Sequence, residues 1–320
     1  ICNHCPYVKA VIKDIVQDVE FLKDLDVKAH EELTAEWILG EAATTIKQTI
    51  GIDPTLVAAI VDIKQPLPST SDQISLFRGM LSGVLDPDKL DYLNRDAYYC
   101  GVPYGIQDTS FLLDELRFHA GNIAISSSGL PAVESALFSR YLMHRTVYWH
   151  KTVRIATAMI KKSVLIGLMD NELQREQLYG LDDEGFKQLL SINHSKSFCL
   201  ASRVFRRELS QIACRVKFNA NNDLHQKLQN PLKRLKIERE IANALKNQSG
   251  FDVSENEVII DVPESVSFDV DIDVINDGFE EHSHYSLIDS ATVFDSSVIK
   301  GFQNQLRYIS LIIPRKPEIL

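Results

Sequence analysis

The sequence lacks several features that would place it in a specialised class of protein. No apolar run reaches the roughly 20 residues that a membrane-spanning helix needs, and no signal-peptide pattern is recognisable. We therefore expect a cytoplasmic protein that does not bind membranes. Five cysteines in 320 residues are too few, and odd in number, for a disulfide framework. The net charge of −10 argues against general nucleic-acid binding, which uses a basic surface.

One short stretch, Ser82 to Gly105, carries an unusual density of acidic and aromatic residues. Asp86 and Pro87 predict the start of a helix, and Gly101 predicts its end. Helical spacing places two sets of residues on opposite faces: Asp88, Tyr92, Asp96 and Tyr99 on the polar face, and Leu90, Leu93 and Ala97 on the apolar face. A charged helix face is most often only solvated, so the residues alone leave that interpretation open.

A second polar face is predicted on a long helix that opens at Leu130 and has no further Gly or Pro until Gly167. Four residues share this face by their spacing: Arg140, His144, Tyr148 and Lys151. Arginine offers a planar fork to phosphate oxygens, histidine can donate a proton, and tyrosine can stack and form hydrogen bonds. The alternative is a polar face that merely covers the core.

Both stretches resemble one protein family. The string D-P-D-K-L-D-Y-L-x-R-D-x-x-x-x-G-V-x-Y-G, from Asp86 to Gly105, resembles the final metal-aspartate helix of HD-domain phosphohydrolases. The resemblance is closest to the branch that contains the deoxynucleoside triphosphate (dNTP) triphosphohydrolases. The string from Ala132 to Val153 resembles the same family, and His30-Glu31 resembles the His-Glu pair that follows its metal motif. The resemblance covers roughly residues 29–320.

This resemblance implies hydrolysis of dNTPs to deoxynucleoside and triphosphate, with a divalent metal ion such as Mg, Mn, Fe or Zn. It implies that Asp88 binds the metal and that His30 and Glu31 assist at the scissile bond. It also implies two sets of substrate contacts: Lys89, Arg140 and His144 with the phosphates, and Tyr92, Asp96 and Tyr148 with the sugar or base. The family further implies a homo-oligomer.

The sequence departs from the family pattern in its metal ligands. The early His and the His-Asp pair should precede His30, but no His-Asp dipeptide occurs there. Asp88 is the one family ligand present in context, and a stable divalent site needs several protein ligands. The alternative function is therefore an inactive HD remnant that binds nucleotides or forms oligomers without turnover.

The first 28 residues differ in character from the rest. The stretch from Cys2 to Lys9, C-N-H-C-P-Y-V-K, resembles the active-site turn of a thioredoxin-like branch related to peroxiredoxins. Cys2 and Cys5 could therefore carry thiol redox chemistry, because a helix N-terminus lowers a thiol pKa. The alternatives are a terminus without function, and a joining of unrelated coding pieces near residue 28.

We predict a mainly α-helical protein: an HD-type helical core without its N-terminal metal motif, followed by a smaller α+β region. The predicted domains are residues 1–28, 29–215 and 216–320. A strand or hairpin is expected over 121–129, and residues 152–215 are expected to be helical throughout, with Cys199 and Cys214 buried. A helix is expected over 224–247, and strands over 257–262, 266–274 and 308–313.

Overall fold

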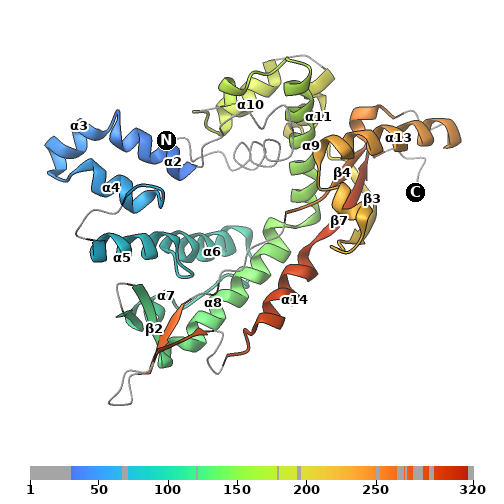
Figure 1. The fold of residues 1–320 in the computed structure, drawn as a ribbon. Coiled ribbons are helices and arrows are strands. Elements are labelled where there is room, and N and C mark those ends of the chain that lie inside the picture. The colour runs from blue at the N-terminus through green and yellow to red at the C-terminus, as the bar shows by residue number, and fades with distance from the viewer. Residues whose placement is uncertain are drawn as a thin grey trace. The chain divides into compact units, whose positions relative to one another are not determined.

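The computed structural model describes residues 30–66, 71–119, 122–178, 180–192, 196–249, 253–264, 270, 272–276, 284–287 and 292–315. The predicted fragment 1–28, with Cys2 and Cys5, lies outside the described residues, as does part of the predicted strand 266–274. The described chain is mainly α-helical and has two small sheets (Figure 1). Within these ranges, every helix is too short or too polar to span a membrane.

The chain divides into two compact units, each built from more than one segment. Among the described residues, unit 1 contains those within 149–264 and 306–315, and unit 2 contains those within 30–148 and 270–305. This grouping differs from the predicted division at residue 215 because the C-terminal region returns to both units. Its last strand joins the sheet of unit 1, whereas an earlier strand joins the sheet of unit 2.

Unit 2 holds the N-terminal helices and a mixed four-stranded sheet. Its helices are α2 (His30–Leu39), α3 (Ala43–Thr45), η3 (Ile46–Ile50), α4 (Pro54–Val61), α5 (Ser71–Ser82), α6 (Pro87–Cys100), α7 (Thr109–Asp114), η4 (Ser127–Gly129), α8 (Leu130–Met143), η5 (His144–Tyr148) and α14 (Ser296–Leu306, whose last residue falls in unit 1). The sheet order is β1 (Leu116–His119), β2 (Asn122–Ser126), β5 (Asp273–Ile275) and β6 (His284–Ser286). The β1–β2 hairpin confirms the strand or hairpin predicted near 121–129, and β2 pairs in parallel with β5.

Helix α6 forms where local sequence signals predict it. The Asp86 side chain accepts a hydrogen bond from the Asp88 N–H and caps the helix, and Gly101 ends it with a φ of +64°. The predicted apolar face is buried, since Leu90, Leu93 and Ala97 are exposed by 5% or less. This face packs toward α8 and α5, whereas Tyr98 and Tyr99 near the end of the helix are exposed.

Unit 1 is built around a long helix and an antiparallel sheet. Its helices are α9 (Lys151–Met169), η6 (Arg175–Leu178), α10 (Asp183–Ile192), η7 (Lys196–Phe198), α11 (Cys199–Phe205), α12 (Asp223–Lys227), α13 (Pro231–Ser249) and η8 (Glu255–Glu257). The strand order is β3 (Gln211–Lys217), β7 (Tyr308–Ile313) and β4 (Ile259–Asp261). Apolar residues of α9 pack against α10, α11 and the sheet, which gives unit 1 its core. The predicted strands near 257–262 and at 308–313 are confirmed.

The predicted continuous helix from Leu130 to Gly167 is wrong. Helix α8 ends at Met143, a π-helical turn follows, and His150 adopts extended backbone (ψ 142°) before α9 begins. His150 leaves the helical conformation because it caps the new helix, with its Nδ1 accepting from the Thr152 N–H at 3.4 Å. Lys151 therefore starts α9 and does not continue the face that carries Arg140 and Tyr148.

Three further expectations for unit 1 are wrong. Residues 152–215 are not helical throughout, because β3 begins at Gln211 and pairs with β7. The helix expected over 224–247 is two helices, because Pro231 starts a new one after the turn that ends α12. Cys199 and Cys214 are exposed, since Cys199 opens α11 and Cys214 lies on the part of β3 that faces solvent.

Candidate functional site

Five predicted site residues come together between α6 and the end of α8, all within unit 2. We call Tyr92, Asp96, Arg140, His144 and Tyr148 the α6–η5 cluster. The Tyr148 hydroxyl donates a hydrogen bond to Asp96 Oδ2 at 2.8 Å. The Tyr148 ring also meets two other rings edge-on, that of Tyr92 at 6.0 Å and that of His144 at 5.2 Å between centroids. Tyr148 is thus the centre of the cluster.

The apolar residues beneath the cluster hold its two helices together. Leu93 and Ala97 from α6 pack with Met143 from α8, and all three are buried. His144 and Tyr148 are the first and last residues of the π-helical turn η5. Such turns occur frequently at functional sites, because the wider turn re-aims the side chains that it carries. Here the turn places the His144 ring edge-on to Tyr148 and directs Tyr148 toward Tyr92 and Asp96 of α6.

His144 is neutral at pH 7 in this environment. Burial, together with the smaller effect of the nearby Arg140 charge, lowers the pKa of its imidazole to about 4. A neutral imidazole carries one N–H donor and one acceptor nitrogen. A phosphate bound beside Arg140 would offset the Arg140 charge and raise the His144 pKa.

The two tyrosines of the cluster keep their protons. Burial raises the pKa of Tyr148, and its hydrogen bond to Asp96 raises it further. Burial also raises the pKa of Tyr92, whereas the Arg140 charge opposes this shift. Both rings therefore offer a hydroxyl donor and an aromatic surface. Together with the Arg140 guanidinium and the Asp96 carboxylate, they bring a cation, a carboxylate, hydroxyl groups and aromatic rings into one cluster.

Asp88 and Lys89 lie at the N-terminal end of α6. Asp88 is exposed, and its charge raises the pKa of Tyr92, so it lies near the cluster. Lys89 Nζ donates to the Gly83 carbonyl at 2.7 Å and lies 3.8 Å from an Asp86 carboxylate oxygen. Lys89 thus helps to fix the start of α6, while its predicted phosphate contact stays a prediction.

A protein-family model described as the HD associated region matches residues 107–283, which is more than half of the chain. The chain belongs to the HD-associated-region family. Its relatives include the uncharacterized proteins MJ1154 of Methanocaldococcus jannaschii and YwfO of Bacillus subtilis. MJ1154 is 34% identical over 46% of this chain and 33% of the relative. YwfO is 34% identical over 42% of this chain and 30% of the relative. The chain therefore spans about a third of the length of these curated relatives.

A solved structure shares the fold of this HD-associated-region protein. A phosphohydrolase from Bacteroides thetaiotaomicron superposes with a TM-score of 0.68 at 19% identity, over 98% of this chain and 76% of that chain. The likeness confirms the predicted fold class, a mainly α-helical HD-type fold with a smaller α+β region.

The described residues do not fit the divalent metal that HD proteins usually bind. Across the ranges that the structure describes, no group of three or more His, Cys, Asp or Glu side chains converges on one point. Asp88 contributes a single exposed carboxylate, whereas a stable divalent site needs several ligands. Metal binding at Asp88 is therefore unsupported by its described neighbours.

The predicted pair His30 and Glu31 opens α2. The side chain of His30 lies outside the described residues, and that of Glu31 is half-buried. Helix α2 packs on α4 through Ala35, Ile38 and Ala58, and α4 leads through α5 to α6. The predicted role of His30 and Glu31 at the scissile bond stays a prediction.

Two supporting residues were not recognised from their sequence positions. Asn94 fixes the segment after α6, since its amide donates to Thr109 Oγ1 and its oxygen accepts from the Gln107 N–H, both at 3.0 Å. Gly105 packs so closely on α6 that a Cβ there would lie 2.3 Å from the Leu93 carbonyl. Gly105, at the end of the G-V-x-Y-G string, is a sequence signal for a close backbone contact, because such a contact requires glycine.

Proposed function

We propose that this chain binds a deoxynucleoside triphosphate as part of an HD-type phosphohydrolase, whose reaction releases deoxynucleoside and triphosphate. The observation that carries the proposal is the hydrogen bond from Tyr148 to Asp96 inside a cluster that also holds Arg140 and two further rings. This arrangement supplies one cation, one carboxylate and stacking surfaces within a single site. A dNTP has the complementary groups.

Each residue of the α6–η5 cluster has a proposed contact. The sugar hydroxyl donates to Asp96 and takes the place of the Tyr148 hydroxyl, while the Tyr92 and Tyr148 rings pack against the sugar or base. Arg140 binds phosphate oxygens through its planar fork, and the neutral His144 donates its N–H to a phosphate. Phosphate binding then raises the His144 pKa and strengthens this contact.

Hydrolysis requires more than the described residues supply. Metal ions assist phosphate-ester hydrolysis by stabilising charge and activating water, and the single Asp88 carboxylate does not form such a site. The second candidate function, a nucleotide-binding or oligomerising module without turnover, is favoured by this incomplete ligand set. Both candidates share nucleotide binding by the cluster, so binding is the property to test first.

The test compares dATP with deoxyadenosine by isothermal titration calorimetry. Replacing Arg140 by Met should weaken dATP binding at least 10-fold, a loss of about 1.4 kcal/mol, and should leave deoxyadenosine binding nearly unchanged. Replacing Asp96 by Asn should weaken both ligands. The matched control is Tyr99→Phe, because Tyr99 lies on α6 but is 80% exposed. The proposal would be disproved if Arg140→Met, Asp96→Asn and Tyr99→Phe bound dATP equally well, or if the parent chain did not bind dATP.

A further inference from the structure

Unit 2 contains a wide groove lined by residues other than those of the α6–η5 cluster. The groove has a volume of about 640 Å³ and lies between α5, α6, α7 and the β1–β2 hairpin. We call it the α6 groove, because α6 supplies much of its lining. Near the start of α6 the lining is apolar and consists of Met80, Leu85 and Pro87. A concave surface of this size and character is typical of a binding site.

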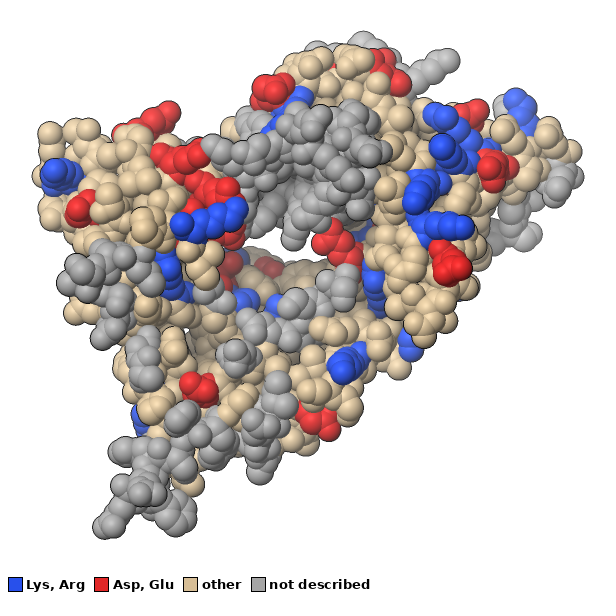
Figure 2. All heavy atoms as spheres, viewed as in Figure 1, with Lys and Arg blue, Asp and Glu red and all other residues tan. Residues whose placement is uncertain are grey.

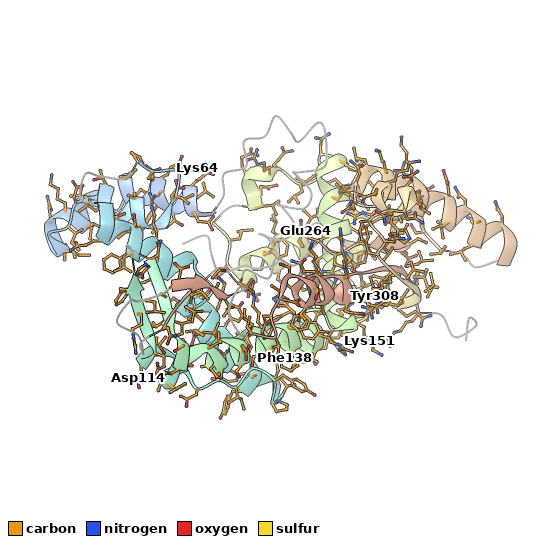
Figure 3. The ribbon with its side chains drawn as sticks, turned by 60° about the horizontal axis from the view of Figure 1, so that its bottom comes forward. Lys64, Asp114, Phe138, Lys151, Glu264 and Tyr308 are labelled. Carbon is orange, nitrogen blue, oxygen red and sulfur yellow. The ribbon has the colours of Figure 1, made fainter. Side chains whose placement is uncertain are left out.

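Large apolar side chains are exposed around the α6 groove. Tyr98 and Tyr99 of α6 line it and are each 80% exposed, with their rings edge-on at 5.3 Å between centroids. Leu113 of α7 also lines the groove and is 53% exposed; it precedes Asp114, which Figure 3 labels. Among the described side chains that Figure 2 shows over α7 and β2, few are charged. Exposed apolar surface that is contiguous in this way indicates a site of protein–protein contact.

One acidic and one basic side chain lie along the exposed face of α6. Asp91, Arg95 and Tyr98 recur at i, i+4 and i+7, so they share one face of the helix, and all three line the α6 groove. Asp91 and Arg95 form an ion pair whose side chains are 58% and 51% exposed. Exposed ion pairs contribute little to stability. Both charges are therefore accessible to a partner surface.

This face of α6 is complementary to a second copy of itself. In a two-fold symmetric interface, every contact between two different residues forms twice, once in each direction. Leu93 lies midway between Asp91 and Arg95 along α6. A two-fold axis level with Leu93 therefore sets the acid of each copy opposite the base of the other, with the two helices antiparallel. Opposite charges that face each other across an interface fix its register and favour association.

The same two-fold axis brings the exposed tyrosines to the apolar end of the groove. Tyr99 and Pro87 are equally far from Leu93 along α6, so they lie opposite each other in two antiparallel copies of the helix. Met80 and Leu85 line the groove beside Pro87. The tyrosine rings then leave water for an apolar groove, and tyrosine is enriched at the centre of protein interfaces. Each copy thus supplies both the rings and the groove that receives them.

We infer that two copies of this chain form a symmetric dimer through the α6 groove. Asp91 of each copy pairs with Arg95 of the other, and Tyr98 and Tyr99 of each copy enter the groove of the other. The inference is independent of the proposed nucleotide function, because Tyr92 and Asp96 of the α6–η5 cluster lie on a different face of α6.

The test measures the molar mass of the full chain by sedimentation equilibrium over a range of protein concentrations. The parent should dimerise, and Asp91→Arg and Arg95→Asp should each weaken dimerisation about 10-fold or more, because each sets like charges opposite each other. The double variant should dimerise like the parent, since opposite signs again face each other. The control is Glu184→Arg, which breaks the mostly exposed pair with Lys187 in unit 1. A monomeric parent, dimerisation unchanged in both single variants, or a double variant that stays monomeric would overturn the inference.

A second measurement tests the tyrosines without changing a charge. Tyr98→Ser should weaken dimerisation about 10-fold, whereas Leu224→Ser should not change it. Leu224 is the control because it is 52% exposed and lies on α12 of unit 1. All variants should keep the helical circular dichroism of the parent, since each replaced side chain is exposed. Equal effects of Tyr98→Ser and Leu224→Ser on dimerisation would overturn the insertion of Tyr98 into the groove.

Discussion

At the scale of single residues, the ion pair between Lys162 of α9 and Glu238 of α13 has the clearest energetic consequence, because both side chains are buried (5% and 3% exposed). Removing one partner of a buried ion pair leaves an uncompensated charge, and this typically costs about 3–5 kcal/mol. We therefore expect Glu238→Gln to lower the free energy of unfolding by about 3 kcal/mol, measured by urea denaturation. The control is Glu184→Gln, because the Lys187–Glu184 pair is mostly exposed and such pairs contribute about 0–1 kcal/mol. Equal losses in the two variants would contradict the buried role.

His144 makes a second residue-scale prediction, for the dependence of stability on pH. Its pKa falls from 6.5 to about 4 on folding, so between these values the unfolded chain binds one proton more than the folded chain. The free energy of unfolding therefore decreases as the pH falls from 6.5 to 4, by about 3 kcal/mol in total. His144→Gln should flatten this dependence. The control variant His150→Gln should keep it, because His150 is exposed. Parallel profiles for the parent and His144→Gln would refute the prediction.

At the scale of elements, replacing glycine by alanine should have opposite effects on stability in two neighbouring helices, α6 and α5. Gly101 ends α6 with a φ of +64°, where an alanine side chain is strained. Gly101→Ala should therefore cost about 1 kcal/mol. Gly79 lies inside α5. Among the described residues, no atom outside its own helical turns lies within 4 Å of the position that an alanine Cβ would take there, so Gly79→Ala should stabilise the protein by about 0.5–1 kcal/mol. Urea denaturation measures both, and two changes of the same sign would contradict this account.

The elements also show what the sequence can and cannot predict. Helix α6 was predictable because Asp86, Pro87 and Gly101 act within a few residues of its ends. The interruption between α8 and α9 was not, since no Gly or Pro marks it, and the bond from Tyr148 to Asp96 joins residues 52 positions apart. The family motifs nevertheless named residues that the fold brings together in the α6–η5 cluster. The Arg154–Asp261 pair spans 107 positions, so its partners could be matched only in the folded chain.

At the scale of the whole molecule, the family region extends over both compact units. Its match from 107 to 283 includes β2 and β5, whose parallel pairing joins the C-terminal segment to unit 2. It also includes α9, β3 and β4 of unit 1. The matched region therefore contains residues of both units. It contributes Arg140, His144 and Tyr148 to the cluster, while Tyr92 and Asp96 precede it.

The described acidic residues lead to a prediction about metal binding by the whole chain. Asp88 is exposed, and the part of the chain that the structure describes places no three metal-binding side chains together. A stable divalent site requires several ligands. We therefore expect the purified chain, and its Asp88→Ala variant, to contain far less than one divalent ion per molecule after dialysis, as measured by elemental analysis. We also expect dATP to bind both proteins with affinities that agree within about two-fold, a difference of about 0.4 kcal/mol.

The opposite result would change the functional conclusion. A stoichiometric ion that Asp88→Ala removes would mean that residues outside the described ranges complete a metal site with Asp88. The chain would then have the ligands for hydrolysis, and the binding module without turnover would be rejected. Assays of dNTP turnover with and without EDTA would follow, because an HD-type reaction at such a site depends on the bound ion. Metal content thus separates the two candidate functions, whereas nucleotide affinity tests the contact residues that they share.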